Sequence, residues 1–267
     1  DVYRALIAVV PGSGSVLGVH QYNSNVYAFR NNSGGTAAVM HVASASGWTS
    51  VALGREIAFT SGGTTEIAVG NTITGATSGA TAVITKVILT SGTWAAGDAA
   101  GRFFFATQTG TFQAENLNVG ASLNLATIAG ASTAITLSPD GRYEFENWNF
   151  GGDAGTKKMY GVDGVNKGFE FDGSVFVKIN TGMTTDTPKH LKIHKNHLLY
   201  SFAGSAQHSG TGDPYTWTVV SGAAELACGD TIVGFLALPG STGGGALGIY
   251  TLNRTLVLYG NDSTDWN

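Results

Sequence analysis

Three histidines fall close together, at His190, His194 and His197 in the segment HLKIHKNH. Imidazole nitrogens are common zinc ligands, so this spacing raises the question of a metal site. In a strand, however, His190 and His194 lie about 13 Å apart on the polar face, whereas zinc ligands lie about 2 Å from the metal. We therefore expect solvent-exposed histidines on a surface strand, with His197 at a turn, and predict no metal site.

Two pairs of carboxylates alternate along short apolar segments, Glu144 with Glu146 and Glu170 with Asp172. Paired carboxylates perform acid and base chemistry in glycoside hydrolases. Residues two apart in a strand share one face at roughly 7 Å, which is also the ordinary pattern of a half-solvated strand. The chain has no repeated Asp-box pattern and no arginine cluster for an acidic sugar. We expect no enzymatic activity and name no catalytic residue.

Two glycine-rich segments, at 11–14 and 240–245, are candidates for phosphate-binding loops. Such a loop has to lead into the N-terminus of a helix, but strand-like sequence follows both segments. The chain also lacks a Gly-x-Ser-x-Gly nucleophile motif. The single cysteine, Cys228, lies among apolar residues and is expected to be a small buried side chain. These patterns predict no cofactor.

Trp94, in a Gly/Thr-rich loop, is the best candidate for an exposed aromatic side chain that stacks on a ligand such as a sugar. The tryptophans at Trp148 and Trp217 lie in strand-like segments instead. Large aromatic rings contribute much of the buried area of a core. We expect Trp148 and Trp217 to pack inside the protein and Trp94 to form an exposed contact.

The elements that carry these residues are predicted to be strands throughout. The chain has 267 residues, of which 39 are glycine, 12% are charged and 43% are hydrophobic. Short alternating segments bounded by Gly, Asn, Asp and Ser recur, and helical periodicity is nearly absent. The net charge of −4 argues against a protein that binds nucleic acid through a basic surface. No apolar segment is long enough to span a membrane. The predicted fold class is all-β.

Four segments share the pattern of an apolar strand, a turn with asparagine and a second alternating strand. They cover 16–29, 159–171, 191–202 and 247–259, and their expected turn residues are Asn25, Asn166, Asn196 and Asn253. Repeated antiparallel sheets of this size are typical of propeller blades. The long gap after the first segment is explained by an insertion rich in Gly, Ala, Thr and Ser. We therefore predict an irregular or partial β-propeller at 1–53 and 137–267, interrupted at 54–136 by a small β-barrel or sandwich domain.

Several segments resemble virion proteins of tailed bacteriophages. The stretches TITGATSGATA (72–82), SGTW (91–94) and GTFQAENL (110–117) are similar to a small β module inserted in phage tail proteins. The segments MYGVDGVNKGFEFDG (159–173) and GDPYTWT (212–218) resemble the irregular propeller of tail nozzle or tail-hub proteins. Since members of that family are usually longer, we expect this chain to be a piece of a larger polypeptide.

The resemblance implies a structural, non-enzymatic virion component. It would form a cyclic homo-oligomer around a DNA passage and would contact other tail proteins of the virion. A weakly acidic chain is compatible with a passage through which DNA slides. Basic side chains that neutralise phosphates would add binding affinity and so hold the DNA in place. The alternative from another class is a receptor- or carbohydrate-binding fibre or spike module, in which Trp94 would contact the ligand. A secreted bacterial β-propeller is a third reading of the same pattern.

Overall fold

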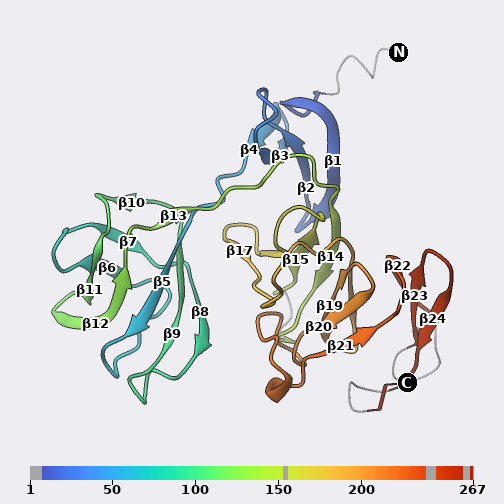
Figure 1. Cartoon of the computed structure of the whole chain (residues 1–267). Helices are drawn as coiled ribbons and strands as arrows, with labels where there is room; N and C mark the ends of the chain where they lie inside the picture. Colours follow the sequence, from blue (N-terminus) through green and yellow to red (C-terminus); the bar gives the residue numbers. More distant parts are fainter. Residues whose placement is uncertain (1–7, 153–155, 239–244, 261–264, 267) are drawn as a thin grey trace. The chain divides into compact units, whose positions relative to one another are not determined.

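The computed structural model describes residues 8–152, 156–238, 245–260 and 265–266 (Figure 1). Within these residues the protein consists of antiparallel strands and one short 3-10 helix, η2 (Val219–Ser221). The predicted all-β class is therefore correct. No helix in the described part of the chain is long and apolar enough to cross a membrane.

The chain divides into two compact units. One unit comprises Asp1–Val51, Leu137–Gly173 and Lys178–Asn267, and the other comprises Ala52–Thr136 with Ser174–Val177. The second unit thus occupies nearly the same residues as the insertion predicted at 54–136. We refer to the two as the main unit and the inserted unit.

Among the described residues, the main unit is built from four sheets in which consecutive strands are neighbours, except that residues 176–177, in the last strand of sheet II, are grouped with the inserted unit. Sheet I contains β1 (Ser13–Tyr22), β2 (Asn25–Asn31), β3 (Ala38–Ser44) and β4 (Gly47–Ser50); sheet II contains β14 (Glu144–Trp148), β15 (Lys158–Val162), β16 (Phe169–Phe171) and β17 (Phe176–Lys178). Sheet III contains β18 (Leu191–His194), β19 (His197–Phe202), β20 (Ser205–His208) and β21 (Ala224–Ala227); sheet IV contains β22 (Ile232–Ala237), β23 (Leu247–Thr251) and β24 (Thr255–Leu258).

Tight turns with left-handed backbone connect the first two strands of sheets I and III. The β1–β2 turn is formed by Asn23 and Ser24, with φ of 46° and 63°, and the β18–β19 turn by Lys195 and Asn196, with φ of 49° and 61°. Two consecutive residues with positive φ match the twist of a two-residue hairpin. The turn predicted at Asn196 is confirmed, whereas Asn25 begins β2 and the residues before it make the turn.

The remaining two predicted turn asparagines also lie between strands. Asn253 lies in the β23–β24 connection, and Asn166 lies in the longer β15–β16 loop. The Asn166 side chain bonds to Ser138, with its Oδ1 accepting from the Ser138 amide at 2.7 Å. It therefore links that loop to the segment that precedes sheet II.

The four sheets follow one another so that their first strands are neighbours, β1 beside β14, β14 beside β18, and β18 beside β22. Aromatic rings fill the space between sheets I and II, where Phe29 stacks on Tyr143 at 4.1 Å between ring centroids. Gly18 is required at this contact, because a Cβ there would lie 2.6 Å from the Cβ of Tyr143. The packing of one sheet on the next therefore holds the first strands in a fixed order.

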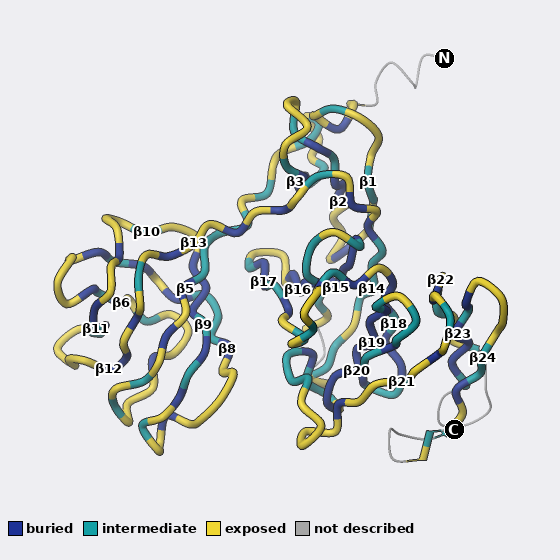
Figure 2. The backbone as a smooth tube through the Cα atoms, in the orientation of Figure 1, coloured by how far each residue is buried: buried dark blue, intermediate teal, exposed yellow. Residues whose placement is uncertain are grey.

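Sheets II and III bury residues on both of their faces. Tyr160, Val162 and Ile179 pack against Leu191, Ile193, Leu198 and Tyr200 between these sheets. A further cluster joins sheet III to sheet IV, with Leu199 and Ala206 on one side and Leu247, Ile249 and Leu258 on the other. Cys228 belongs to this second cluster and is 4% exposed, as predicted for a small buried side chain. The buried residues of the main unit therefore lie largely between sheets (Figure 2).

The inserted unit is a nine-stranded sheet. Its strands are β5 (Arg55–Ser61), β6 (Thr72–Gly75), β7 (Thr81–Val83), β8 (Lys86–Ser91), β9 (Ala100–Phe105), β10 (Gln108–Thr109), β11 (Ala114–Val119), β12 (Ser122–Ala129) and β13 (Thr133–Ala134). One face supplies the core, in which Ile73, Leu117 and Phe103 are fully buried. The other face carries threonine and asparagine around β11, where Asn118 pairs with Thr74, and charged residues around β9, where Arg102 Nη1 donates to Glu56 Oε2 at 2.8 Å.

Candidate functional site

A hollow of about 600 Å³ lies where the first strands of the four sheets of the main unit approach one another. The strands β1, β14, β18 and β22 each contribute to its lining. Its lining residues are His20, Tyr143, Glu144, Phe145, Glu146, Asn147, Leu191, Lys192 and Phe235. The hollow therefore brings together the predicted carboxylate pair and the lysine that follows Leu191.

The carboxylates of Glu144 and Glu146 bind side chains of the next sheet. Glu144 Oε1 lies 2.9 Å from His190 Nδ1, and Glu146 Oε1 accepts a hydrogen bond from Lys192 Nζ at 2.6 Å. The second oxygen of Glu146 accepts from the backbone amide of Ile193 at 3.1 Å. The two side chains remain partly exposed, at 38% and 21%, as expected for a half-solvated strand, but the same face also contacts sheet III.

A matching contact joins sheets I and II. His20 Nε2 lies 2.9 Å from Asn147 Oδ1, and Asn147 Nδ2 donates to the backbone oxygen of Gln21 at 2.9 Å. The His20 ring also stacks on Phe145, with 5.0 Å between ring centroids. Polar groups around the hollow therefore cross-link neighbouring first strands. This arrangement can fix the sheets in place, and it engages the carboxylates of Glu144 and Glu146 in contacts with the next sheet.

The three histidines predicted to be exposed are all buried. His190 and His194 are 8% exposed and His197 is fully buried. His197 Nδ1 lies 2.6 Å from the oxygen of Ser209, and its Nε2 lies 3.0 Å from Thr211 Oγ1. The prediction failed because both faces of sheet III are covered, so the polar face of β18 does not reach solvent.

Aromatic contacts surround the histidines near the end of the described chain. The rings of His194, His197 and His208 lie 6.1, 5.1 and 4.9 Å from that of Trp266. Burial lowers the pKa of His194 to about 4, with Lys195, His197 and Lys192 adding repulsion. Among the described residues, no group of three or more His, Cys, Asp or Glu side chains has the geometry of a metal site.

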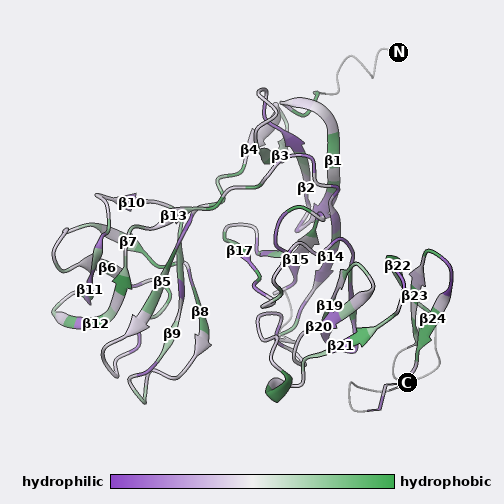
Figure 3. Ribbon diagram, in the orientation of Figure 1, coloured by the Kyte–Doolittle hydropathy of each residue, from purple (hydrophilic) through white to green (hydrophobic). Residues whose placement is uncertain are grey.

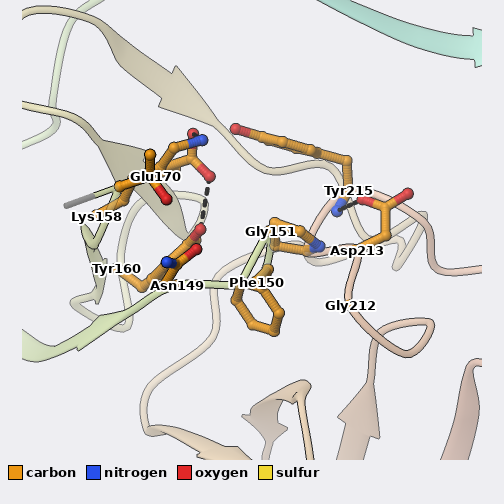
Figure 4. Close-up of a pocket in the computed structure, with 11 residues that line it drawn as sticks. Asn149, Phe150, Gly151, Lys158, Tyr160, Glu170, Gly212, Asp213 and Tyr215 are labelled. Carbon is orange, nitrogen blue, oxygen red and sulfur yellow. Dashed lines mark hydrogen bonds and ion pairs between the residues drawn. The ribbon is translucent and has the colours of Figure 1, made fainter. Parts of the chain in front are cut away.

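A second pocket of about 380 Å³ is centred on the other predicted carboxylate segment (Figure 4). Glu170, 2% exposed, accepts hydrogen bonds from Lys158 Nζ and Tyr160 Oη, each at 2.7 Å. Burial, followed by the nearby Glu170 charge, raises the pKa of the Tyr160 hydroxyl well above its ordinary range. Glu170 therefore lies between an ammonium group and a phenol, and the half-solvated position expected for it is wrong.

The opposite wall of this pocket is formed by Phe150, Gly212, Asp213 and Tyr215. Asp213 Oδ1 accepts from the backbone amide of Tyr215 at 2.8 Å, and its Oδ2 accepts from the hydroxyl of Thr216. The pocket thus combines aromatic rings with two fixed carboxylates, a lining that suits a small hydroxylated ligand. Asp172, the other predicted partner of Glu170, does not line it.

Trp94 does not form the predicted exposed contact. It is 7% exposed, and its ring is nearly parallel to that of Phe59, at 5.2 Å and 7°. The amide of Gly97 donates to the Trp94 carbonyl at 2.9 Å, and Thr93 N donates to Asp98 Oδ1 at 2.8 Å. These bonds fold the segment into a compact turn that directs the indole into the core of the inserted unit.

The two tryptophans predicted to pack differ from each other. Trp217 stacks on Tyr200 at 5.1 Å between ring centroids, as predicted. Trp148 is 39% exposed, and its Nε1 donates to Asn196 Oδ1 at 3.0 Å. The glycine-rich segment at 11–14 leads directly into β1, and most of 240–245 lies outside the described residues.

Comparison with known proteins finds no matching family model and no matching curated protein. The assignment of this chain therefore depends on its own residues. The cross-links around the hollow were missed from the sequence, although one signal was present. Glu144 and Glu146 are two residues apart on β14, the first strand of sheet II. His190 and Lys192 are also two residues apart, around the start of β18, the first strand of sheet III.

Proposed function

We propose that this protein is a structural component of a bacteriophage tail, a nozzle or hub subunit that contributes to a ring around the DNA passage. The observation that carries the proposal is the serial packing of the four sheets through neighbouring first strands. We infer that the main unit is a partial β-propeller, since blades of this architecture are consecutive antiparallel sheets arranged about an axis.

The chemistry of the central hollow supports a scaffold role. Its two glutamates are engaged by His190, Lys192 and the amide of Ile193. A glycosidase needs a carboxylic acid and a carboxylate aimed at one substrate, whereas Glu144 and Glu146 join two sheets. We therefore propose that the protein acts through its rigid shape and its surfaces and carries no active site.

The second candidate function is that of a saccharide-binding tail fibre or spike module. The pocket between Glu170 and Asp213 favours it, because polar groups and the rings of Phe150, Tyr160 and Tyr215 converge there. Trp94 does not support a saccharide-binding function, since its ring is buried.

Immunogold electron microscopy of virions from the encoding phage tests the proposal. Antibodies raised against the inserted unit are expected to label one position on the tail axis, and class averages of the purified protein are expected to show rings. Label on lateral fibres, or threefold spikes in the averages, would favour the saccharide-binding module. Virions that lack the protein altogether would overturn both proposals.

A further inference from the structure

The pocket of about 380 Å³ beside Glu170 has one wall built on sheet II. Lys158 and Tyr160 lie on β15, and Tyr160 is paired with Glu170 of β16 across the two strands. Both carboxylate oxygens of Glu170 are engaged, Oε1 by Lys158 Nζ and Oε2 by the Tyr160 hydroxyl. The side chains of Lys158 and Glu170 are 27% and 2% exposed, so the lysine is the member of this ion pair that remains accessible.

The opposite wall of the pocket, at 212–215, is held in place by hydrogen bonds. The amide of Gly212 donates to the oxygen of Asn196 at 2.8 Å, and Asp213 Oδ1 accepts from the amide of Tyr215 at 2.8 Å. Figure 4 shows the Tyr215 side chain extending from this wall toward the wall on sheet II. A wall that is already formed lowers the entropic cost of binding a ligand.

Aromatic rings and polar groups make up most of the lining. Among the described residues, no Leu, Ile, Val or Met lines the pocket. The ring of Phe150 packs edge-on against Tyr160, with 5.2 Å between centroids and 88° between planes. The segment 210–218 is close to neutral in hydropathy, whereas the η2 helix that follows it is coloured as hydrophobic (Figure 3). Such rings offer apolar faces to the C–H groups of a ligand beside polar groups that fix its orientation.

The charges of the lining disfavour ions and apolar molecules as ligands. Lys158, Glu170 and Asp213 supply one positive and two negative side chains, a formal net charge of −1. A small anion would lie beside two carboxylates, and a small cation would lie beside an ammonium group. An apolar molecule would take water from the ion pair and return no hydrogen bond, which is costly. Hydroxyl groups both donate and accept, so a neutral polyhydroxylated molecule can bond to both members of the pair.

We propose that this pocket binds one neutral hexopyranose ring, either as a free sugar or as the terminal residue of a glycan. Its volume lies near the lower end of the range of about 300–1,000 Å³ for small-molecule pockets, which suits one ring better than a chain of several. Two adjacent ring hydroxyls would bond to Lys158 and Glu170, and the C–H face of the ring would pack on Tyr215. The inference rests on the saccharide-binding function, the second candidate, and adds the class of sugar and the residues that select it.

Titration of the full chain with methyl glycosides of glucose, galactose and mannose tests the pocket, with binding measured by calorimetry and saturation-transfer NMR. The corresponding methyl uronides are matched ligands that differ by a carboxylate. At least one neutral glycoside is expected to bind roughly 10-fold more tightly than its uronide, because the added carboxylate would be repelled by the net negative lining. Equal or tighter binding of the uronide would overturn the inference.

Disaccharides that carry the same terminal residue distinguish the two sources of the sugar. Equal affinity for the methyl glycoside and the disaccharide would identify a glycan terminus as the ligand. Binding of the methyl glycoside alone would identify a free sugar. Both results support a pocket for one neutral ring.

Two pocket variants locate the binding. Lys158→Met is expected to weaken it about 10- to 100-fold, as for the loss of a hydrogen bond to a charged group. Lys189→Met, at an exposed position outside the pocket, removes the same charge and is expected to bind like wild type. Thr156→Trp fills the pocket from an exposed lining position and serves if Lys158→Met unfolds in circular dichroism; Thr184→Trp, also exposed, is its control.

The negative outcomes separate this inference from the proposed functions. Absence of binding by all three neutral glycosides at millimolar concentrations would overturn it. Binding that both pocket variants retain would also overturn it, while leaving a saccharide-binding function at another place on the protein. Neither result affects the tail-ring proposal, because electron microscopy of virions tests that proposal without any sugar.

Discussion

Lys192 Nζ donates to Glu146 Oε1 at 2.6 Å and so joins the first strands of sheets II and III. The two side chains are 24% and 21% exposed, which places the pair between a surface ion pair and a buried one. The polar residues that alternate along β14 thus form part of the contact between sheets II and III.

The energy of this pair is measurable in a double-mutant cycle with Glu146→Ala and Lys192→Met. We expect a coupling free energy of about 1 kcal/mol in urea unfolding, at the upper end for pairs that water still reaches. Glu225→Ala in place of Glu146→Ala serves as the control, since Glu225 is exposed on β21. A coupling near zero in 0.1 M salt would show that the ion pair does not hold the sheets together.

In the inserted unit, Glu115 closes the loop that precedes β7. Its Oε2 accepts from the amides of Thr77 and Ser78, each at 2.8 Å, and its Oε1 accepts from the Ser78 hydroxyl at 2.6 Å. Burial raises the pKa of Glu115, but the hydrogen bonds from Ser78, Thr77 and Gln113 outweigh it and hold the pKa below its ordinary value.

We expect Glu115→Gln to destabilise the inserted unit by about 2 kcal/mol at pH 7, because its amide nitrogen cannot accept these bonds. Since the folded pKa is lowered, the stabilisation is present above the unfolded pKa and disappears as pH falls through the folded pKa. Hydrogen–deuterium exchange of residues 75–82 measures it, with the exposed Glu66→Gln as control. Equal protection in wild type and Glu115→Gln at pH 7 would contradict the assignment.

The sequence predicts strands and their order well, because turn residues and apolar periodicity are local properties. It also places the insertion close to the boundary of the inserted unit. It fails for His190, His194 and Glu170, which alternation assigns to a solvated face. Their burial depends on which sheet lies beside them, a long-range relationship that spacing along one strand does not contain.

Trp94 illustrates a different limit of sequence-based prediction. A Gly/Thr-rich loop is a typical place for an exposed aromatic side chain, yet the loop turns back and buries the ring against Phe59 and Phe103. We expect Trp94→Ala to cost about 3–5 kcal/mol in unfolding free energy through the cavity it leaves. Leu123→Ala, at a 65% exposed position of the same unit, is the control and is expected to be nearly neutral.

The same Trp94→Ala protein separates a core role from a ligand-binding role. Screening folded wild type against a glycan array and then titrating any binder measures whether the indole contributes to affinity. We expect no change in glycan affinity while the variant remains folded. A specific loss of binding with unchanged thermal stability would restore Trp94 as a contact residue.

Acid sensitivity is expected at the buried His194. Burial and the charges of Lys195, His197 and Lys192 lower its pKa from 6.5 to about 4, so the folded state resists protonation. The unfolded chain binds a proton near pH 6.5, and stability therefore falls as pH decreases from about 6.5 to about 4, then levels off for this group.

Thermal melts across this range are expected to show a smaller loss for His194→Phe than for wild type. Some loss will remain, because burial also lowers the pKa of His208 and His41. An unchanged slope in His194→Phe would mean that His194 titrates alike in the folded and unfolded states.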